Sequence, residues 1–190
     1  MRIIAGVHRG RTLLSPESDI TRPITDRVKQ SLFDILAPLI PDGVAYDCFA
    51  GTGSMGLECL SRGAAQAIFF EMDRSALARL RGNIETLKAQ KVSTVIPADL
   101  FRYFAGQPTL PPADLIFLDP PYRFLRERSE PLQQLAAQLA AHMKPSATLI
   151  FRHDADDQLD LPSLKKYDER YYGGMMLELL HPSLKISPNS

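Results

Sequence analysis

The chain has 190 residues, a length that fits one globular domain and can bury a full core without disulfides or metals. Hydrophobic residues make up 45% of it and charged residues 23%, which excludes disordered, collagen-like and low-complexity classes. No apolar run approaches the roughly 18–20 residues of a membrane span, and the N-terminus lacks the hydrophobic region of a secretory signal, so we expect a cytoplasmic protein.

Charge is unevenly distributed along the chain. The 22 Lys and Arg residues balance 22 Asp and Glu residues, but residues 1–30 contain six basic and three acidic side chains. A basic end on a mildly acidic body can bind a polyanion locally. Cys48 and Cys59 are not spaced as a metal or redox pair and are predicted to be buried thiols, and the four histidines lack ligand spacing, so no metal site is expected.

The first elements in chain order are short strands at residues 2–5 and 12–14, followed by a helix over residues 26–37. Thr25 can cap this helix, and Pro38 ends it. Apolar residues at helical spacing give it one buried face, made of Val28, Leu32, Ile35, Leu36 and Leu39.

Strands and helices then alternate. Strands are predicted at residues 44–49, 67–71, 92–96, 114–118 and 147–151, helices at 55–62, 75–88 and 130–143, and a closing antiparallel hairpin at 165–171 and 175–180. This order predicts a doubly wound α/β fold, with a mostly parallel sheet, an antiparallel C-terminal hairpin and a small basic N-terminal extension.

A glycine-rich loop follows the first buried strand and opens a helix. Gly51, Gly53 and Gly56 form G-x-G-x-x-G, where a ligand would pass close to the backbone and the tight turn can need positive φ. Glu71 ends the next strand, where a carboxylate can accept hydrogen bonds from ribose hydroxyls. This combination predicts a nucleotide-type ligand.

The acid that precedes the loop narrows the choice of ligand. Asp47-x-Phe49-Ala50-Gly51-x-Gly53 resembles motif I of class I S-adenosylmethionine-dependent methyltransferases. The resemblance implies that Glu71 holds the ribose and that Asp99 binds the adenine amine, although Asp99 can also cap a short helix over residues 100–105. The residues expected at the cofactor are Asp47, Phe49, Ala50, Gly51, Gly53, Gly56, Glu71, Met72, Asp99 and Leu100.

The fourth buried strand ends at Asp119-Pro120-Pro121-Tyr122. Ligands sit beyond the carboxyl ends of strands in open α/β sheets, so this tetrapeptide lies where a substrate is expected. The Asp119 carboxylate and Pro120 carbonyl can orient an exocyclic amine, the prolines hold both acceptors still, and Tyr122 can stack on a base. The motif matches that of methyltransferases acting on planar amines, so all four residues are expected at the catalytic site.

The N-terminus resembles one family in particular. Segments 2–6, 9–11, 21–28 and 31–36, together with 57–58, 61–64 and 119–122, are similar to the RsmD family of bacterial small-subunit rRNA guanine-N2 methyltransferases. The resemblance implies a Rossmann-like methyltransferase domain at 41–181 preceded by RNA-contacting strands and a helix at 1–40. The segment at 182–190 is predicted from the sequence to be a flexible tail. The residues expected at RNA are Arg9, Arg11, Arg22, Thr25, Asp26, Arg27, Arg123 and Arg126.

The partner expected from this resemblance is small-subunit ribosomal RNA within an assembled or assembling subunit, and a monomer is expected. An adenine-N6 methyltransferase acting on DNA or RNA shares Asp119–Tyr122 and stays open as an alternative. An NAD-binding oxidoreductase would share the glycine loop and Glu71 but leaves the tetrapeptide without a purpose. A non-catalytic RNA-binding module is disfavoured because both motifs are intact.

Overall fold

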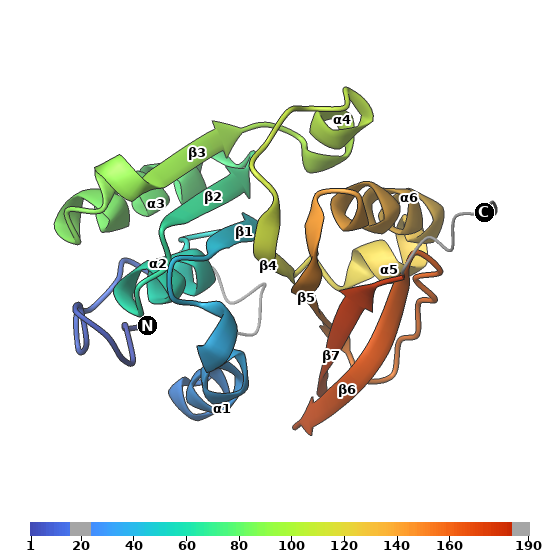
Figure 1. Cartoon of the computed structure of the whole chain (residues 1–190), viewed down its shortest axis with the longest axis horizontal. Helices are drawn as coiled ribbons and strands as arrows, with labels where there is room; N and C mark the ends of the chain where they lie inside the picture. Colours follow the sequence, from blue (N-terminus) through green and yellow to red (C-terminus); the bar gives the residue numbers. More distant parts are fainter. Residues whose placement is uncertain (16–23, 184–190) are drawn as a thin grey trace.

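The computed structural model describes residues 1–15 and 24–183, which form one sheet with helices on both faces (Figure 1). The sheet has seven strands in the order β3-β2-β1-β4-β5-β7-β6, in which β1 to β5 are parallel and the β6–β7 hairpin is antiparallel. The predicted doubly wound sheet and its antiparallel hairpin are therefore confirmed. The elements are α1 (Asp26–Leu36), η1 (Ala37–Leu39), β1 (Val44–Cys48), α2 (Ser54–Ser61), β2 (Gln66–Glu71), α3 (Arg74–Thr86), η2 (Gln90–Val92), β3 (Ser93–Pro97), α4 (Leu100–Ala105), β4 (Ala113–Leu118), α5 (Arg123–Glu127), α6 (Ser129–Ala140), β5 (Met143–Asp154), β6 (Leu164–Tyr172) and β7 (Met175–Pro182).

The strand order reverses between β1 and β4. The chain moves outward from β1 through β2 to β3 and then returns to β4 on the other side of β1. Such a reversal opens a crevice beyond the carboxyl ends of the two strands, where open α/β sheets bind ligands. The glycine loop follows β1 and the Asp-Pro-Pro-Tyr tetrapeptide follows β4, so the fold brings both motifs to this crevice.

Alternate residues of the central strands pack on opposite faces of the sheet. On one face Ala45 packs with α1, while Phe69 packs with α2 and α3; on the other, Tyr46 and Phe70 pack with α4 and α6. Both cysteines are buried free thiols in these layers, as predicted. Within the described residues, no helix is both long and apolar enough to cross a membrane.

Two predicted boundaries are wrong. The helix predicted over residues 130–143 ends at Ala140, because Met143 instead begins β5 and pairs with Ala113 of β4. The strand predicted over residues 147–151 extends to Asp154, because β7 pairs with its far edge beyond the end of β4. Antiparallel pairing with β7 therefore extends β5 beyond the end of β4. It adds three residues after Phe151, starting with Arg152.

Residues 1–15 pack against the main body. The two short strands predicted there form one isolated bridge, between Arg2 and Thr12, and Ile3 and Leu13 are buried against α2 and α3. Leu14 exchanges backbone hydrogen bonds with the buried Asn83 side chain of α3. The domain boundaries at residues 40 and 181 stay predictions, and of the predicted tail, residues 184–190 lie outside the described part of the chain.

Candidate functional site

The loop between β1 and α2 turns sharply. Phe49, Gly51 and Gly53 all have positive φ, at 60°, 55° and 82°, and Gly53 is the N-cap of α2. Phe49 adopts a conformation that is costly for a residue with a large side chain, and such strain is typical of ligand-binding turns. The loop thus presents its backbone, rather than side chains, at the crevice between β1 and β4.

The three glycines are required for different reasons. A Cβ on Gly53 would lie 2.3 Å from Leu80 Cδ1, and one on Gly56 would lie 2.4 Å from Phe69 Cε1. The positive φ expected in the tight turn is confirmed at Gly51 and Gly53, and the core side chains beside Gly53 and Gly56 give a further reason for glycine at these two positions. A Cβ on Gly51 would meet nothing within 4 Å, so Gly51 borders open space that a ligand can enter.

Gly56→Ala is expected to destabilise the protein by about 1–3 kcal/mol, because the Phe69 ring would have to move within a packed core. The matched control is Gly82→Ala in α3, whose new methyl would meet only the tip of the Leu14 side chain, at 3.1 Å. Urea unfolding of the two variants measures the difference. Equal stabilities would show that the Phe69 contact does not constrain the loop.

Asp47 supports the loop from inside the protein. Its side chain is 3% exposed, and its carboxylate accepts a hydrogen bond from the Gly56 N–H at 2.8 Å. Burial raises the pKa of Asp47 to about 7, although the Gly56 N–H counteracts part of this rise. We therefore interpret Asp47 as a residue that fixes the start of α2 rather than as a direct ligand of a cofactor.

Glu71 lies against the open side of the loop. Its Oε2 accepts the Gly51 N–H at 2.7 Å, and its Oε1 accepts the N–H groups of Met72 and Asp73, both at 2.8 Å. Three backbone donors thus orient a carboxylate at the end of β2. The Met72 side chain beside it is 65% exposed, which is unusual for a large apolar residue and leaves it available to a ligand.

Asp99 ends the next strand along. It caps α4 by accepting the Arg102 N–H at 3.2 Å, so the capping role predicted for it is confirmed. The Leu100 side chain is 4% exposed and packs in the core. The loop, Glu71 and Asp99 therefore line the carboxyl ends of three neighbouring strands, β1, β2 and β3.

Three phenylalanine rings gather beside the glycine loop. The rings of Phe49, Phe101 and Phe124 have pairwise centroid distances of 6.0 Å, and the Arg128 guanidinium lies 4.4 Å from the centroid of Phe101. The sequence analysis missed Phe101, Phe124 and the stacking of Arg128. The available signal was that an aromatic residue stands two positions after Asp99 and another two positions after Tyr122.

Asp119, directly after β4, pairs with a residue that the sequence analysis also missed. Arg152 Nε of β5 lies 3.1 Å from Asp119 Oδ1, and the two side chains are 11% and 30% exposed. Burial raises the pKa of Asp119, and the Arg152 charge opposes that rise. The arginine carbon Cζ is 5.9 Å from the Tyr122 ring centroid, so Arg152 contacts both ends of the tetrapeptide.

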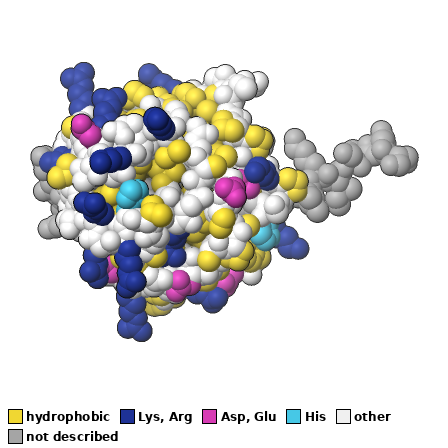
Figure 2. Space-filling model, turned by 60° about the vertical axis from the view of Figure 1, so that its left-hand side comes forward, with side chains coloured by type: hydrophobic (Ala, Val, Ile, Leu, Met, Phe, Trp, Pro, Cys, Tyr) yellow, Lys and Arg dark blue, Asp and Glu magenta, His cyan; other side chains and the backbone are white. Residues whose placement is uncertain are grey.

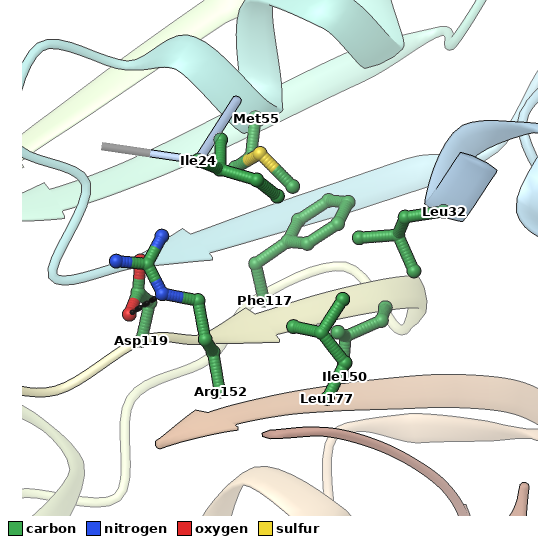
Figure 3. Close-up of a pocket in the computed structure, with 8 residues that line it drawn as sticks. All are labelled: Ile24, Leu32, Met55, Phe117, Asp119, Ile150, Arg152 and Leu177. Atoms are coloured by element: carbon green, nitrogen blue, oxygen red, sulfur yellow. Dashed lines mark ion pairs between the residues drawn. The ribbon is translucent and has the colours of Figure 1, made fainter. Parts of the chain in front are cut away.

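A pocket adjoins this ion pair (Figure 3). Asp119 and Arg152 lie together at one end of it, whereas the remaining lining side chains are apolar. Its lining consists of Ile24, Leu32, Met55, Phe117, Asp119, Ile150, Arg152 and Leu177.

The basic residues predicted to contact RNA do not form one cluster. Arg9 and Arg11 are exposed on the N-terminal segment, whereas Arg123 and Arg126 belong to α5, which packs on the other face of the sheet. Figure 2 shows Lys and Arg side chains gathered over the side of the molecule formed by the N-terminal segment, α2 and α3.

Several of these residues already have partners within the chain. Arg126 pairs with Asp157 at 2.7 Å, and Asp26 pairs with Arg2 at 2.6 Å. Thr25 caps α1 as predicted by accepting the Val28 N–H at 3.3 Å. Arg27 is exposed, and Arg22 lies outside the described residues.

Comparisons with known proteins agree with this arrangement. A family model described as Conserved hypothetical protein 95 matches residues 1–181. Ribosomal RNA small subunit methyltransferase D of Escherichia coli is 46% identical over 123 residues, which cover 65% of this chain. The match spans 61% of that relative, less than two thirds of its length. The protein of the same name from Haemophilus influenzae is 37% identical over 166 residues, covering 85% of this chain and 83% of its own.

The likeness extends to three-dimensional structure. The solved structure of the yhhF protein from Escherichia coli has a TM-score of 0.83 and 33% identity, covering 97% of this chain and 99% of that one. The fold of nearly the whole chain is thus shared with that structure. The chain therefore belongs to the Conserved hypothetical protein 95 family, and the resemblance to the RsmD family inferred from the sequence is confirmed.

Proposed function

We propose that the chain transfers a methyl group from S-adenosylmethionine to the exocyclic N2 amine of a guanine in small-subunit (16S) ribosomal RNA. The observation that carries this proposal is the meeting of two motifs at the crevice between β1 and β4, with the glycine loop on one side and Asp119–Tyr122 on the other. Relatives whose names state small-subunit rRNA methylation, at 46% and 37% identity, support the choice of substrate.

The residues at the ends of β1, β2 and β3 fit the cofactor. Gly51 borders open space, and Glu71 and Asp99 offer carboxylates that can accept hydrogen bonds from the ribose and from the adenine amine. The phenylalanine rings beside the loop suit a flat adenine. When bound, S-adenosylmethionine supplies an electrophilic methyl group on a positively charged sulfur.

Asp119 and the Pro120 carbonyl prepare the target amine. An exocyclic amine on a base is a poor nucleophile because its lone pair is delocalised into the ring. Hydrogen bonds to these two acceptors orient the amine and stabilise the positive charge that develops on nitrogen as the new N–C bond forms. Asp119 then lies next to the proton that the amine must lose, while Tyr122 offers a stacking surface to the base.

Glu71→Ala is expected to weaken S-adenosylmethionine binding about 10- to 100-fold, because a hydrogen bond to a charged group contributes about 1.5–3 kcal/mol. The control is Glu85→Ala on the exposed side of α3. Isothermal titration with S-adenosylmethionine, and with NAD in parallel, measures the change. Tight NAD binding by the wild-type chain would support the oxidoreductase alternative instead.

The RNA contacts and the state of the substrate are parts of the same proposal. Arg9, Arg11 and Arg27 are exposed and can neutralise phosphates, which contributes affinity rather than sequence choice. The target base must be unstacked to reach Asp119, which favours a loop or bulge in folded RNA over intact duplex. An assembled or assembling subunit would present such a base together with additional contacts.

The test is transfer of labelled methyl groups from S-adenosylmethionine to three substrates, namely undermethylated small subunits, protein-free 16S rRNA and duplex DNA. Label in the subunits or the rRNA, with none in DNA, is the expected result. Label in DNA alone would contradict the proposed substrate and favour the adenine-N6 alternative.

A further inference from the structure

We propose that Arg152 is a positioning residue for the methyl-transfer site, one that holds Asp119 through its Oδ1 atom so that Oδ2 faces the target amine. This inference rests on the proposed function and adds a residue to it. Arg152 lies outside both motifs on which that function was argued.

The backbone places the two residues side by side. In the parallel pairing of β4 with β5, Leu118 is opposite Phe151. The residues that follow are Asp119, directly after β4, and Arg152, still within β5. Phe117 and Ile150, two positions earlier, line the pocket between the sheet and α1, and Asp119 and Arg152 line the same pocket. The pairing is thus fixed by strand register rather than by a flexible loop.

The length of β5 makes this possible. Its pairing with β7 continues beyond the end of β4, and Arg152 is held opposite Leu177. The Arg152 side chain is only 11% exposed and lines the pocket together with Asp119 and apolar side chains. An arginine so enclosed cannot easily move away from Asp119 because a buried guanidinium needs a charged partner.

Arg152 also balances the charges around Asp119. The Asp119 charge contributes to the raised pKa of Asp47 on β1, after burial, so these two acids interact electrostatically. Tyr122, from the loop after β4, is the other titratable neighbour, and Arg152 lies beside its ring. Without the guanidinium, burial would favour the protonated form of Asp119, which accepts hydrogen bonds poorly.

A carboxylate can accept through both oxygens, so the pairing of Oδ1 with Arg152 leaves Oδ2 able to accept an N–H of the amine. The contact therefore fixes the rotamer of Asp119 and favours its ionised form before the base arrives. This predicts that Arg152 acts on the rate and on its pH dependence, and not on cofactor affinity.

The experiment compares Arg152→Met with the matched control Arg170→Met, which removes an exposed arginine that pairs with Asp168 on the edge strand β6. For Arg152→Met we expect kcat/KM for the RNA substrate to fall about 10- to 100-fold, the effect of a misplaced catalytic group. The acidic limb of its pH profile should move upward by about one to three pH units, since loss of an adjacent positive charge raises a carboxyl pKa by that amount. Affinity for S-adenosylmethionine should change less than about twofold, a difference within RT.

A wild-type rate and pH profile in a folded Arg152→Met protein would overturn the inference. Arg152→Lys keeps the positive charge and serves as the test if Arg152→Met does not fold. We expect it to retain the wild-type acidic limb of the pH profile while lowering kcat. An upward shift of that limb would contradict the inference. Titration of the Asp119 carboxyl by ¹³C NMR separates this inference from the proposed function, because it needs no activity. A higher pKa of Asp119 in Arg152→Met supports the contact even if no methyl transfer is found, and an unchanged pKa refutes it.

Discussion

Asp119→Ala is expected to lower kcat for methyl transfer by about 10²- to 10⁴-fold at saturating S-adenosylmethionine and RNA, the range for loss of a group that positions and stabilises the reacting atoms. The physical reason is that the substitution removes the acceptor that orients the amine and takes up its developing charge. Gly51, Glu71 and Asp99, which we propose contact the cofactor, belong to other strand ends, so cofactor affinity should stay within about twofold of wild type.

Two further variants sharpen this test. Asp119→Asn keeps an oxygen acceptor but loses the charge and leaves Arg152 without its carboxylate, so we expect it to retain only part of the activity. Asp168→Ala on the exposed edge strand β6 is the control for a lost acid. If Asp119→Ala weakened cofactor binding and kept wild-type turnover at saturation, the assignment of roles to the two motifs would be wrong.

Glu58→Ala is expected to have the largest effect on stability, about 3–5 kcal/mol, because it leaves a buried cation unpaired. Glu58 is fully buried, and its Oε2 lies 2.9 Å from Nζ of Lys29, which is 1% exposed. The same carboxylate accepts the N–H groups of Ile4 and Ala5 and the Arg62 Nε–H, at 2.9–3.0 Å. One side chain thus joins the N-terminal segment, α1 and α2.

Urea unfolding of Glu58→Ala, Glu85→Ala and the double variant Lys29→Met with Glu58→Leu tests this. The double variant should recover part of the lost stability, because it removes both charges of the Lys29–Glu58 pair, whereas the N–H groups of Ile4 and Ala5 still lose their acceptor. A loss below about 1 kcal/mol for Glu58→Ala would show that the pair behaves like an exposed one.

The Glu58 network also predicts a pH dependence of stability. Burial alone would raise the pKa of Glu58, but Lys29 and the hydrogen-bond donors hold it below its usual range. A carboxyl with a lowered folded-state pKa contributes stability above its unfolded pKa and loses it as the pH falls through the folded value. Wild-type stability should therefore decline on acidification more than that of the double variant, which lacks this carboxyl.

Local patterns were sufficient to predict the elements and motifs of the site. Each of these features depends on only a few neighbouring residues. They are the strand before Gly51, Glu71 at the end of β2, and Asp99 at the start of α4. The predicted parallel units follow from the alternation of strands and helices, and the structure confirms them.

What could not be predicted depends on contacts between distant segments. Pairing across the sheet places β7, rather than β6, beside β5. This pairing extends β5 to include Arg152. Lys29 was counted with the basic N-terminal surface, but Glu58, remote in sequence, pairs with it inside the protein. That the core also requires glycine at 53 and 56 could not be predicted, because the sequence does not reveal that Leu80 and Phe69 occupy the space beside them.

The most direct test of the central claim is the identity of the methylated nucleoside. Undermethylated small subunits are incubated with the wild-type chain and S-adenosylmethionine, and the RNA is digested to nucleosides for mass analysis. We expect N2-methylguanosine, absent when Asp119→Ala replaces the wild-type chain. N6-methyladenosine would contradict the choice of base, and a product formed equally well by Asp119→Ala would contradict the role of the tetrapeptide.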